Sequence, residues 1–239
     1  MRREAKNVQD AGETPDESAR GHTSPLTPDA LPVVKRMGLV DYEPTWRAMQ
    51  DFTTQRNDDT ADELWLLEHP AVYTLGIAGK AEHLPRAANG IPVVRIDRGG
   101  QITYHGPGQV VLYLLVDMKR RGLSVRPLVR LMEQAVIDLL KSHGIDAVFR
   151  ADAPGVYVND AKIAALGLRI RRGCCYHGLA LNVDMDLAPF RDINPCGYPG
   201  LHVTQTRDLG IADTPAEIGA ELIEHFLKRL PQANSPRRV

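Results

Sequence analysis

The predicted fold rests on two short apolar runs, "AKIAALGLRI" at residues 161–170 and "CYHGLALNV" at residues 175–183. Each run has the length and the apolar content of a strand, and a brief polar stretch containing glycine separates them. A third run, "GVYV" at residues 155–158, precedes them closely. The three runs predict a meander with short connections, which favours antiparallel or mixed pairing over repeated crossovers.

Four further runs upstream read as strands because they are rich in β-branched and aromatic residues and are bounded by Gly and Pro. They are "ELWLLEH" at 63–69, "AVYTLG" at 71–76, "IPVVRI" at 91–96 and "QVVLYLLVDM" at 109–118. With the helices described next, they predict one α/β domain in α+β order, with a mixed, largely antiparallel sheet and flanking helices.

Three amphipathic helices are expected around this sheet. The first carries Tyr42, Trp46, Met49 and Phe52 at helical spacing. The second starts after Ser124 as N-cap and stops at Gly144, and apolar residues recur along it. The third begins with a capping box formed by Thr214 and Glu217.

Length and composition are those of one globular domain with two tails. The chain has 239 residues, of which 43% are hydrophobic, and a formal net charge of −1. Such a charge creates no general attraction for nucleic acid or an anionic membrane. No apolar run approaches the ~20 residues of a membrane-spanning helix, and a cytoplasmic location is expected. We expect a disordered tail at residues 1–30, the folded domain at 31–230 and a short tail at 231–239.

A glycine-rich segment, "RGGQITYHGPGQ" at residues 98–109, lies between two of the predicted strands. Its glycines allow close approach of the backbone to a ligand, and its polar side chains supply contacts. The segment lacks the spacing of a phosphate-binding loop. Composition alone favours a hairpin and a binding loop about equally.

Lys162 and Cys196 are the two candidates for chemistry. Lys162 opens an otherwise apolar strand, although a strand-end lysine is ordinarily solvated. Cys196 stands between Pro195 and Gly197, where it is either an inert turn residue or a nucleophile. A nucleophilic thiol needs a neighbouring cation that lowers its pKa. Candidates for that neighbour are Lys162, His105, His177 and His202.

Other chemistries have weaker support. Cys174 and Cys175 lie in a strand pattern and are expected to be structural, with side chains on opposite faces. The chain contains no paired ligand spacing typical of a zinc site and no G-x-S-x-G motif of a serine hydrolase. We therefore expect neither a metal nor a cofactor.

Taken together, "RGGQITYHGPGQ", "AKIAALGLRIRRGCCYHGLALNVDMDL" and "INPCGY" resemble, in order and spacing, the motifs of bacterial octanoyltransferases, the lipoyl(octanoyl) transferases of protein lipoylation. The resemblance spans residues 31–230. It implies a fold similar to the catalytic domains of biotin and lipoate protein ligases. It also implies transfer of an octanoyl group from octanoyl-acyl carrier protein to a lysine of lipoyl domains, those of 2-oxoacid dehydrogenases and the glycine cleavage H protein.

In this family reading, Cys196 is the nucleophile that forms an octanoyl thioester, and Lys162 lowers its pKa. The substrate-binding residues carried over are Arg98, Gly99, Gly100, Gln101, Ile102, Thr103, Tyr104, His105, Ala165, Leu166, Gly167, Gly178, Leu179 and Ala180. Position 165 is often Ser in the family, so a side-chain contact there is in doubt.

Alternatives on the same fold are an octanoyl or lipoyl amidotransferase and an ATP-dependent lipoate ligase. A noncatalytic binder of acyl carrier protein or lipoyl domains is a third. A basic run, Arg169, Arg171 and Arg172, is a candidate docking site for an acidic partner, or simply a solvated strand end.

Overall fold

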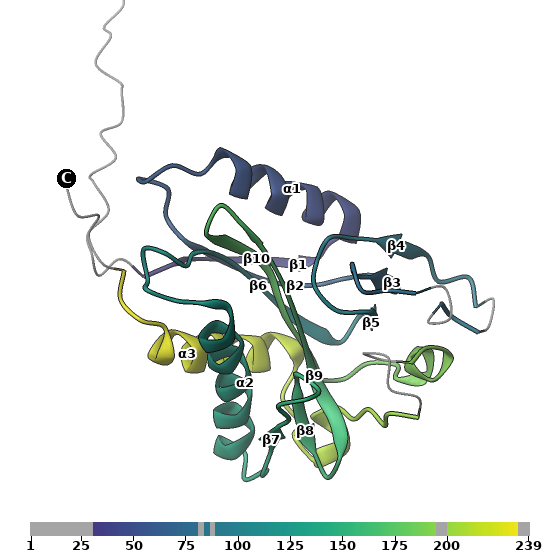
Figure 1. The fold of residues 1–239 in the computed structure, drawn as a ribbon. Helices are drawn as coiled ribbons and strands as arrows, with labels where there is room; N and C mark the ends of the chain where they lie inside the picture. The colour runs from purple at the N-terminus through teal and green to yellow at the C-terminus, as the bar shows by residue number, and fades with distance from the viewer. Residues whose placement is uncertain (1–30, 81–83, 87–88, 195–199, 234–239) are drawn as a thin grey trace, which may run out of the picture.

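The computed structural model describes residues 31–80, 84–86, 89–194 and 200–233. Its main sheet has seven strands in the order β1-β2-β6-β10-β9-β8-β7 (Figure 1). β1 and β2 run parallel, and every other neighbouring pair in this sheet is antiparallel. The strands are β1 (Val33–Leu39), β2 (Glu63–Glu68), β6 (Gln109–Asp117), β7 (Val148–Phe149), β8 (Val156–Val158), β9 (Ala161–Arg171) and β10 (Cys174–Asn182). The predicted meander of β8, β9 and β10 is confirmed.

Alternation along the central strands builds two separate cores. In β2, Leu64 and Leu66 face one side of the sheet and Trp65 and Leu67 face the other. The same period of two runs along β6, because successive side chains of a strand point to opposite faces. Both faces of the central strands are therefore buried, which explains why β6 reads as a nearly continuous apolar run.

Helices cover both faces (Figure 1). α2 (Val125–Ser142) and α3 (Pro215–Arg229) pack together on one face, and α1 (Tyr42–Gln55) covers the other. All three predicted helices are present, and α3 starts with the predicted capping box. Ser124 occupies the N-cap of α2, but its side chain makes no capping hydrogen bond. None of the helices described is long and apolar enough to cross a membrane.

A second, three-stranded sheet in the order β4-β3-β5 supports the glycine-rich segment. It consists of β3 (Val72–Leu75), β4 (Val93–Arg95) and β5 (Ile102–His105). β5 pairs antiparallel with β3 and then turns into β6, so part of the predicted loop is a strand. The turn requires glycine at position 108, where φ is +85° and a β-carbon would lie 1.9 Å from the carbonyl oxygen of Asp184.

β1 was not among the predicted strands. It pairs parallel with β2, and α1 connects the two, so the fold contains one βαβ unit besides its antiparallel meander. The sequence "VVKRMGL" shows no clean alternation because β1 is an edge strand with mostly exposed or half-buried side chains. An edge strand without a buried face leaves little periodic signal.

Candidate active site

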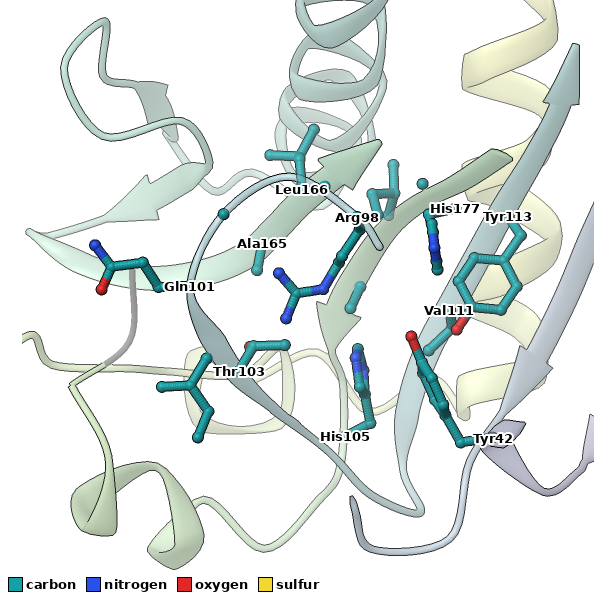
Figure 2. A pocket seen from close by; sticks show the side chains of 16 residues that line it. Tyr42, Arg98, Gln101, Thr103, His105, Val111, Tyr113, Ala165, Leu166 and His177 are labelled. Atoms are coloured by element: carbon teal, nitrogen blue, oxygen red, sulfur yellow. The ribbon is translucent and has the colours of Figure 1, made fainter. Parts of the chain in front are cut away.

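A narrow cavity of about 50 Å³ lies where the glycine-rich segment meets β9 and β10 (Figure 2). All predicted substrate-binding residues except Gly99 and Tyr104 line it. Pairing of β9 with β10 brings the two strand segments together, with Ala165 opposite Ala180 and Gly167 opposite Gly178. Four further residues that the sequence did not single out as binding residues complete the lining: Tyr42, Val111, Tyr113 and His177.

Glycines let the 98–100 loop lie directly on β9. The Gly99 N–H donates to the carbonyl of Leu168 at 2.9 Å, so Gly99 anchors the loop instead of lining the cavity. At Gly167, a β-carbon would lie 2.9 Å from Cδ of Arg98. The Arg98 guanidinium is tied back to Thr74, donating to its carbonyl and its hydroxyl, each at 2.8 Å.

Tyr104 faces away from the cavity. Thr103 and His105 line the cavity from one side of β5, and alternation directs Tyr104 to the other side. There its ring packs against Tyr73 and Phe190, with centroids 5.5 and 5.4 Å away. Tyr104 thus supports the strand from the side opposite the cavity.

Buried aromatic and imidazole rings close one end of the cavity. Tyr42 stacks on His105. His69 forms a hydrogen bond at each ring nitrogen: Nε2 bonds to the Tyr113 hydroxyl at 2.8 Å and Nδ1 to the Val40 carbonyl at 2.7 Å. Burial lowers the pKa of His69 to about 4, and burial with the neighbouring His69 lowers that of His105 to about 3. Both imidazoles are therefore neutral, and the His69 proton at Nδ1 is donated to the carbonyl oxygen.

His177 belongs to this end and is held by Asp97, which lies between β4 and the glycine-rich segment. The His177 Nε2 lies 3.1 Å from Oδ1 of Asp97, and Trp46, Gln50 and Tyr176 also donate to that carboxylate. Burial by itself would raise the pKa of Asp97, but these hydrogen bonds outweigh it and hold the pKa well below its usual range. Asp97 is therefore an anion that orients the His177 ring.

Lys162 lies beside the main cavity in a second, smaller one. That cavity shares Thr103 and Ala165 with the first. The Lys162 side chain is 3% exposed, and its Nζ donates to the carbonyl oxygen of Pro154 at 2.9 Å. Its ammonium also lies 5.5 Å from the ring centre of Tyr157. Lys162 is thus a buried amine held at the cavity and not a solvated strand-end lysine.

Cys196 lies outside the described residues, so the predicted pairing of Cys196 with Lys162 stays a prediction. The chain that follows is anchored at Lys162: the Lys162 N–H donates to the carbonyl of His202 at 2.8 Å, and the Thr204 N–H donates to the carbonyl of Lys162 at 3.0 Å. Position 196 is six positions along the chain from this anchoring point at position 202.

The other two cysteines are structural, as expected. Both are buried free thiols, and Cys175 donates to the carbonyl of Leu114. Burial raises the pKa of Cys175 to about 12, which suppresses its thiolate. In the part of the chain that the structure describes, no group of three or more His, Cys, Asp or Glu side chains could hold a metal ion.

The basic run lies far from Lys162. Arg169, Arg171 and Arg172 are exposed at the opposite end of β9, and Arg171 donates to the Thr54 hydroxyl of α1 at 3.0 Å. Arg171 lies nine positions along the extended strand from Lys162, which is about 30 Å. A partner bound at this basic run would therefore have to extend along the length of β9 to reach Lys162.

Comparison with known proteins agrees with the fold and identifies the family. Residues 41–227 match the lipoyl protein ligase A/B catalytic domain. An octanoyltransferase of Azoarcus sp. is 61% identical over 91% of this chain and 96% of its own length, and an octanoyltransferase of Thiobacillus denitrificans is 70% identical over 78% and 85%.

Solved structures share the fold at much lower identity. A lipoate-protein ligase A bound with ATP superposes with a TM-score of 0.69 at 16% identity, covering 83% of this chain and 85% of that one. A biotin protein ligase from Aquifex aeolicus gives 0.54 at 13% identity, covering 83% and 70%. The predicted fold and family are thereby confirmed, and the chain belongs to the octanoyltransferase family of acyltransferases, which is built on the lipoyl protein ligase A/B catalytic domain.

Proposed function

We propose that this enzyme takes an octanoyl group from octanoyl-acyl carrier protein and places it on a lysine of a lipoyl domain, through a thioester on Cys196. The acceptors are the lipoyl domains of 2-oxoacid dehydrogenases and the glycine cleavage H protein. One observation carries the proposal: the buried amine of Lys162 adjoins a narrow, largely apolar cavity formed by the predicted substrate-binding segments.

The first step exchanges one thioester for another. The Cys196 thiolate attacks the carbonyl carbon of the donor, a new C–S bond forms, and the carrier leaves as a thiolate that takes up a proton. The energy of the bond is conserved, so no ATP is consumed. Lys162 as an ammonium stabilises the attacking thiolate, because a nearby cation raises the reactive fraction of a thiol.

The second step forms the amide. The amine of the acceptor lysine attacks the Cys196 thioester, a C–N bond forms, and Cys196 leaves as a thiolate. Lys162, once deprotonated, accepts the proton that the incoming amine loses. The amide is more stable than the thioester and draws the reaction forward.

The anchoring of residues 202–204 on Lys162 supports this assignment. Backbone hydrogen bonds fix position 202 beside Lys162, and six residues span at most about 20 Å. A contact between Cys196 and the amine, which the proposal requires, is within the reach of the chain. The predicted substrate-binding residues are proposed to hold the acyl chain, with Gly99 acting through the loop backbone and Tyr104 from behind β5.

Intact mass measurement tests the proposal directly. After incubation with octanoyl-acyl carrier protein, the wild type is expected to gain one octanoyl group, and Cys196→Ala none. Lys162→Met is expected to acylate at least about 100-fold more slowly, because it removes the cation that stabilises the attacking Cys196 thiolate. Cys174→Ala is the matched control and should acylate normally. A wild-type protein that is folded and remains unmodified, or a Cys196→Ala variant that transfers at the wild-type rate, would contradict the proposal.

The likeness to an ATP-bound lipoate-protein ligase favours one competing function, an ATP-dependent ligase. The two are separated by supplying free octanoate with ATP and, in a parallel reaction, the acyl carrier thioester without ATP. We expect product only in the second reaction. Product only with octanoylated lipoyl domain as donor would indicate an amidotransferase, and binding without product would indicate a noncatalytic binder.

The catalytic domain is proposed to span residues 31–230, which encloses the matched family region at 41–227. Residues 1–30 and 231–239 then lie outside it. A chain lacking residues 1–30 is expected to form the thioester at the wild-type rate.

A further inference from the structure

A long connection leaves the main sheet at the end of β10 and returns to it beside Lys162. β10 pairs with β9 as far as Ala164. Two positions away on β9, Lys162 pairs with Val203 in a parallel bridge, so the returning chain takes the place of β10 there. The connection, residues 183–201, includes Cys196 in its sequence. Its two ends therefore meet next to Lys162.

Asn182, the last residue of β10, joins these two ends. Its Nδ2 donates to the carbonyl oxygen of Thr204 at 3.0 Å, and its own carbonyl oxygen accepts from the Thr206 N–H at 3.1 Å. The Thr204 N–H in turn donates to the carbonyl oxygen of Lys162 at 3.0 Å. Asn182 is buried, so these bonds form away from water. One amide side chain thus closes the base of the connection directly beside the residue that carries the amine.

Gln109, the first residue of β6, holds that amide from the neighbouring strand. Gln109 and Asn182 are partners in the pairing of β6 with β10. The Nε2 of Gln109 donates to Oδ1 of Asn182 at 2.9 Å, and Oε1 of Gln109 lies 2.7 Å from Nδ1 of His105. Both amides are buried and line the small cavity that also contains Lys162. A row of hydrogen bonds therefore runs from His105, which lines the main cavity, to the base of the connection.

The direction of every bond in this row is fixed by its last member. The backbone carbonyl of Thr204 can only accept, so Asn182 presents Nδ2 to it and Oδ1 to Gln109. Gln109 then presents Nε2 to Asn182 and Oε1 to His105, whose Nδ1 carries the proton. Neither amide can turn over without placing two oxygens or two N–H groups face to face. A fully paired buried row of this kind holds its members in one arrangement.

We propose that Asn182 and Gln109 are positioning residues, which fix the base of the 183–201 connection so that Cys196 lies within reach of Lys162. This rests on the proposed function. Asn182 makes the bond to the returning chain, and Gln109 acts through Asn182. Loss of either amide leaves buried polar groups unpaired and loosens the tie between β10 and the returning chain. The thiol and the amine then lose their fixed relation, and small misplacements of reacting groups slow a reaction strongly.

The pKa of the Cys196 thiol is a quantity that a general loss of stability would leave unchanged. It is obtained from the rate of alkylation by iodoacetamide between about pH 6.5 and 9.5, with every protein carrying Cys174→Ala. Cys175 does not interfere, because burial raises its pKa to about 12. In the otherwise wild-type protein, the ammonium of Lys162 should hold the thiol pKa below its ordinary value of about 8.5.

Asn182→Ala is expected to raise the pKa of the Cys196 thiol toward that ordinary value. The single-turnover rate of thioester formation at saturating octanoyl-acyl carrier protein should fall about 100-fold. KM should change little, because Asn182 does not line the main cavity. An Asn182→Ala variant that is folded and keeps the wild-type thiol pKa and rate would overturn the proposal.

Gln109→Met tests the indirect role. Methionine is similar in length and uncharged, and it can neither donate to Asn182 nor accept from His105. The thiol pKa and the rate should move in the same direction as in Asn182→Ala but by less, because Asn182 keeps its own bond to Thr204. Added to Asn182→Ala, the Gln109→Met substitution should cause no further shift in the thiol pKa. A further shift equal to that of Gln109→Met alone would overturn the role of Gln109.

Thr45→Ala is the matched control. It removes another buried hydrogen bond, which the Thr45 hydroxyl donates to the carbonyl oxygen of Asp41 at 2.7 Å, at the start of α1. It should lower the stability to urea and leave the thiol pKa and the acylation rate unchanged. If Asn182→Ala does not fold, as judged by circular dichroism, Gln109→Met decides: wild-type values of the thiol pKa and the rate would then overturn the proposal.

The outcomes separate the two proposals. If the wild type shows an ordinary thiol pKa and forms no thioester with octanoyl-acyl carrier protein, the proposed function fails. If it forms the thioester, and the Asn182 and Gln109 variants match it in thiol pKa and rate, only the positioning role fails.

Discussion

The side chain of Lys162 packs directly against the α-carbon of Gly155. A β-carbon at residue 155 would lie 2.5 Å from Cε and 3.0 Å from Nζ of Lys162, and 2.8 Å from the carbonyl oxygen of Ala164. The carbonyl that accepts from Lys162 belongs to Pro154, the residue before. The turn that enters β8 and the side chain of Lys162 therefore fit together only when residue 155 is glycine.

Gly155→Ala is expected to slow thioester formation about 100-fold, because the methyl group displaces Lys162 and small misplacements of reacting groups have effects of this size. The positive φ of 146° adds about 1–3 kcal/mol of lost stability. Gly122→Ala is the matched control: φ is +62° and nothing lies within 4 Å of its β-carbon. It should lose stability without slowing the acylation measured by rapid-quench mass spectrometry. Equal acylation rates in the two variants would contradict the displacement of Lys162.

Glu133 in α2 holds the same turn from behind. Its Oε1 accepts from the Gly155 N–H at 3.1 Å, and its side chain is 3% exposed. Glu133→Ala leaves that buried N–H unpaired, so we expect a loss of about 1–3 kcal/mol in the free energy of unfolding and slower thioester formation. Glu133→Gln keeps the acceptor and should restore both in large part.

The effects of the two Glu133 substitutions are measured by urea unfolding and by the rate of octanoyl-enzyme formation. Arg130→Ala is the control for the ion pair, because Arg130 is half exposed and its contact with Glu133 should contribute less than about 1 kcal/mol. A Glu133→Gln variant as slow as Glu133→Ala would show that the charge, and not the hydrogen bond to Gly155, positions the turn.

Asp62 is the anion on which three arginines converge, at the end of the sheet where β2 begins. It contacts Arg56, Arg120 and Arg121 at 2.5, 2.8 and 2.6 Å, and its side chain is 1% exposed. Asp62→Asn leaves three cations without their counter-ion, so the free energy of unfolding should fall by about 3–5 kcal/mol. Asp138→Asn, which removes a partly exposed pair with Arg229, should cost less than about 1 kcal/mol. Similar urea midpoints for Asp62→Asn and Asp138→Asn would contradict this expected difference in stability.

Acid should destabilise the protein between pH 6.5 and about 4. The pKa of His69 falls on folding from 6.5 to about 4, and that of His105 falls from 6.5 to about 3, chiefly through burial. Below pH 6.5 the unfolded chain binds a proton at each histidine that the folded protein does not, so stability is complete above pH 6.5 and declines as the pH drops. Each group contributes a slope of about 1.4 kcal/mol per pH unit while it remains neutral in the fold.

Urea unfolding at half-unit steps from pH 7 to pH 4.5 measures that slope. Asp97 and Asp62 have lowered pKa values and lose their contribution only below the ordinary value of 3.8, outside this window. His69→Gln retains hydrogen-bonding capacity without the titration, and it should reduce the slope by about 1.4 kcal/mol per pH unit, while His105 and His177, whose pKa values burial also lowers, keep their contributions. A stability that stays constant from pH 6.5 to 4.5 would show that the two imidazoles are not buried as neutral groups.

Elements whose patterns arise from short-range geometry were predictable from the amino-acid sequence. The apolar runs "QVVLYLLVDM" and "CYHGLALNV" predicted β6 and β10, and the Thr214–Glu217 box predicted the start of α3, because each of these signals lies within a few consecutive residues of the chain. Buried strands were therefore found, whereas the exposed edge strand β1 was missed. The long family motifs identified the enzyme class.

The way in which those segments meet depends on the three-dimensional fold. Asp97 and His177 lie 80 residues apart in the sequence. They touch because the fold places the loop that follows β4 against β10. No local pattern in the sequence encodes that contact or the closed end of the cavity. Lys162 likewise reads as an ordinary strand-end lysine until the turn at Pro154 and Gly155 buries it. The environment of each of these side chains depends on pairing between strands that are far apart in the sequence. That pairing is set by the complete fold, so no short stretch of sequence predicts it.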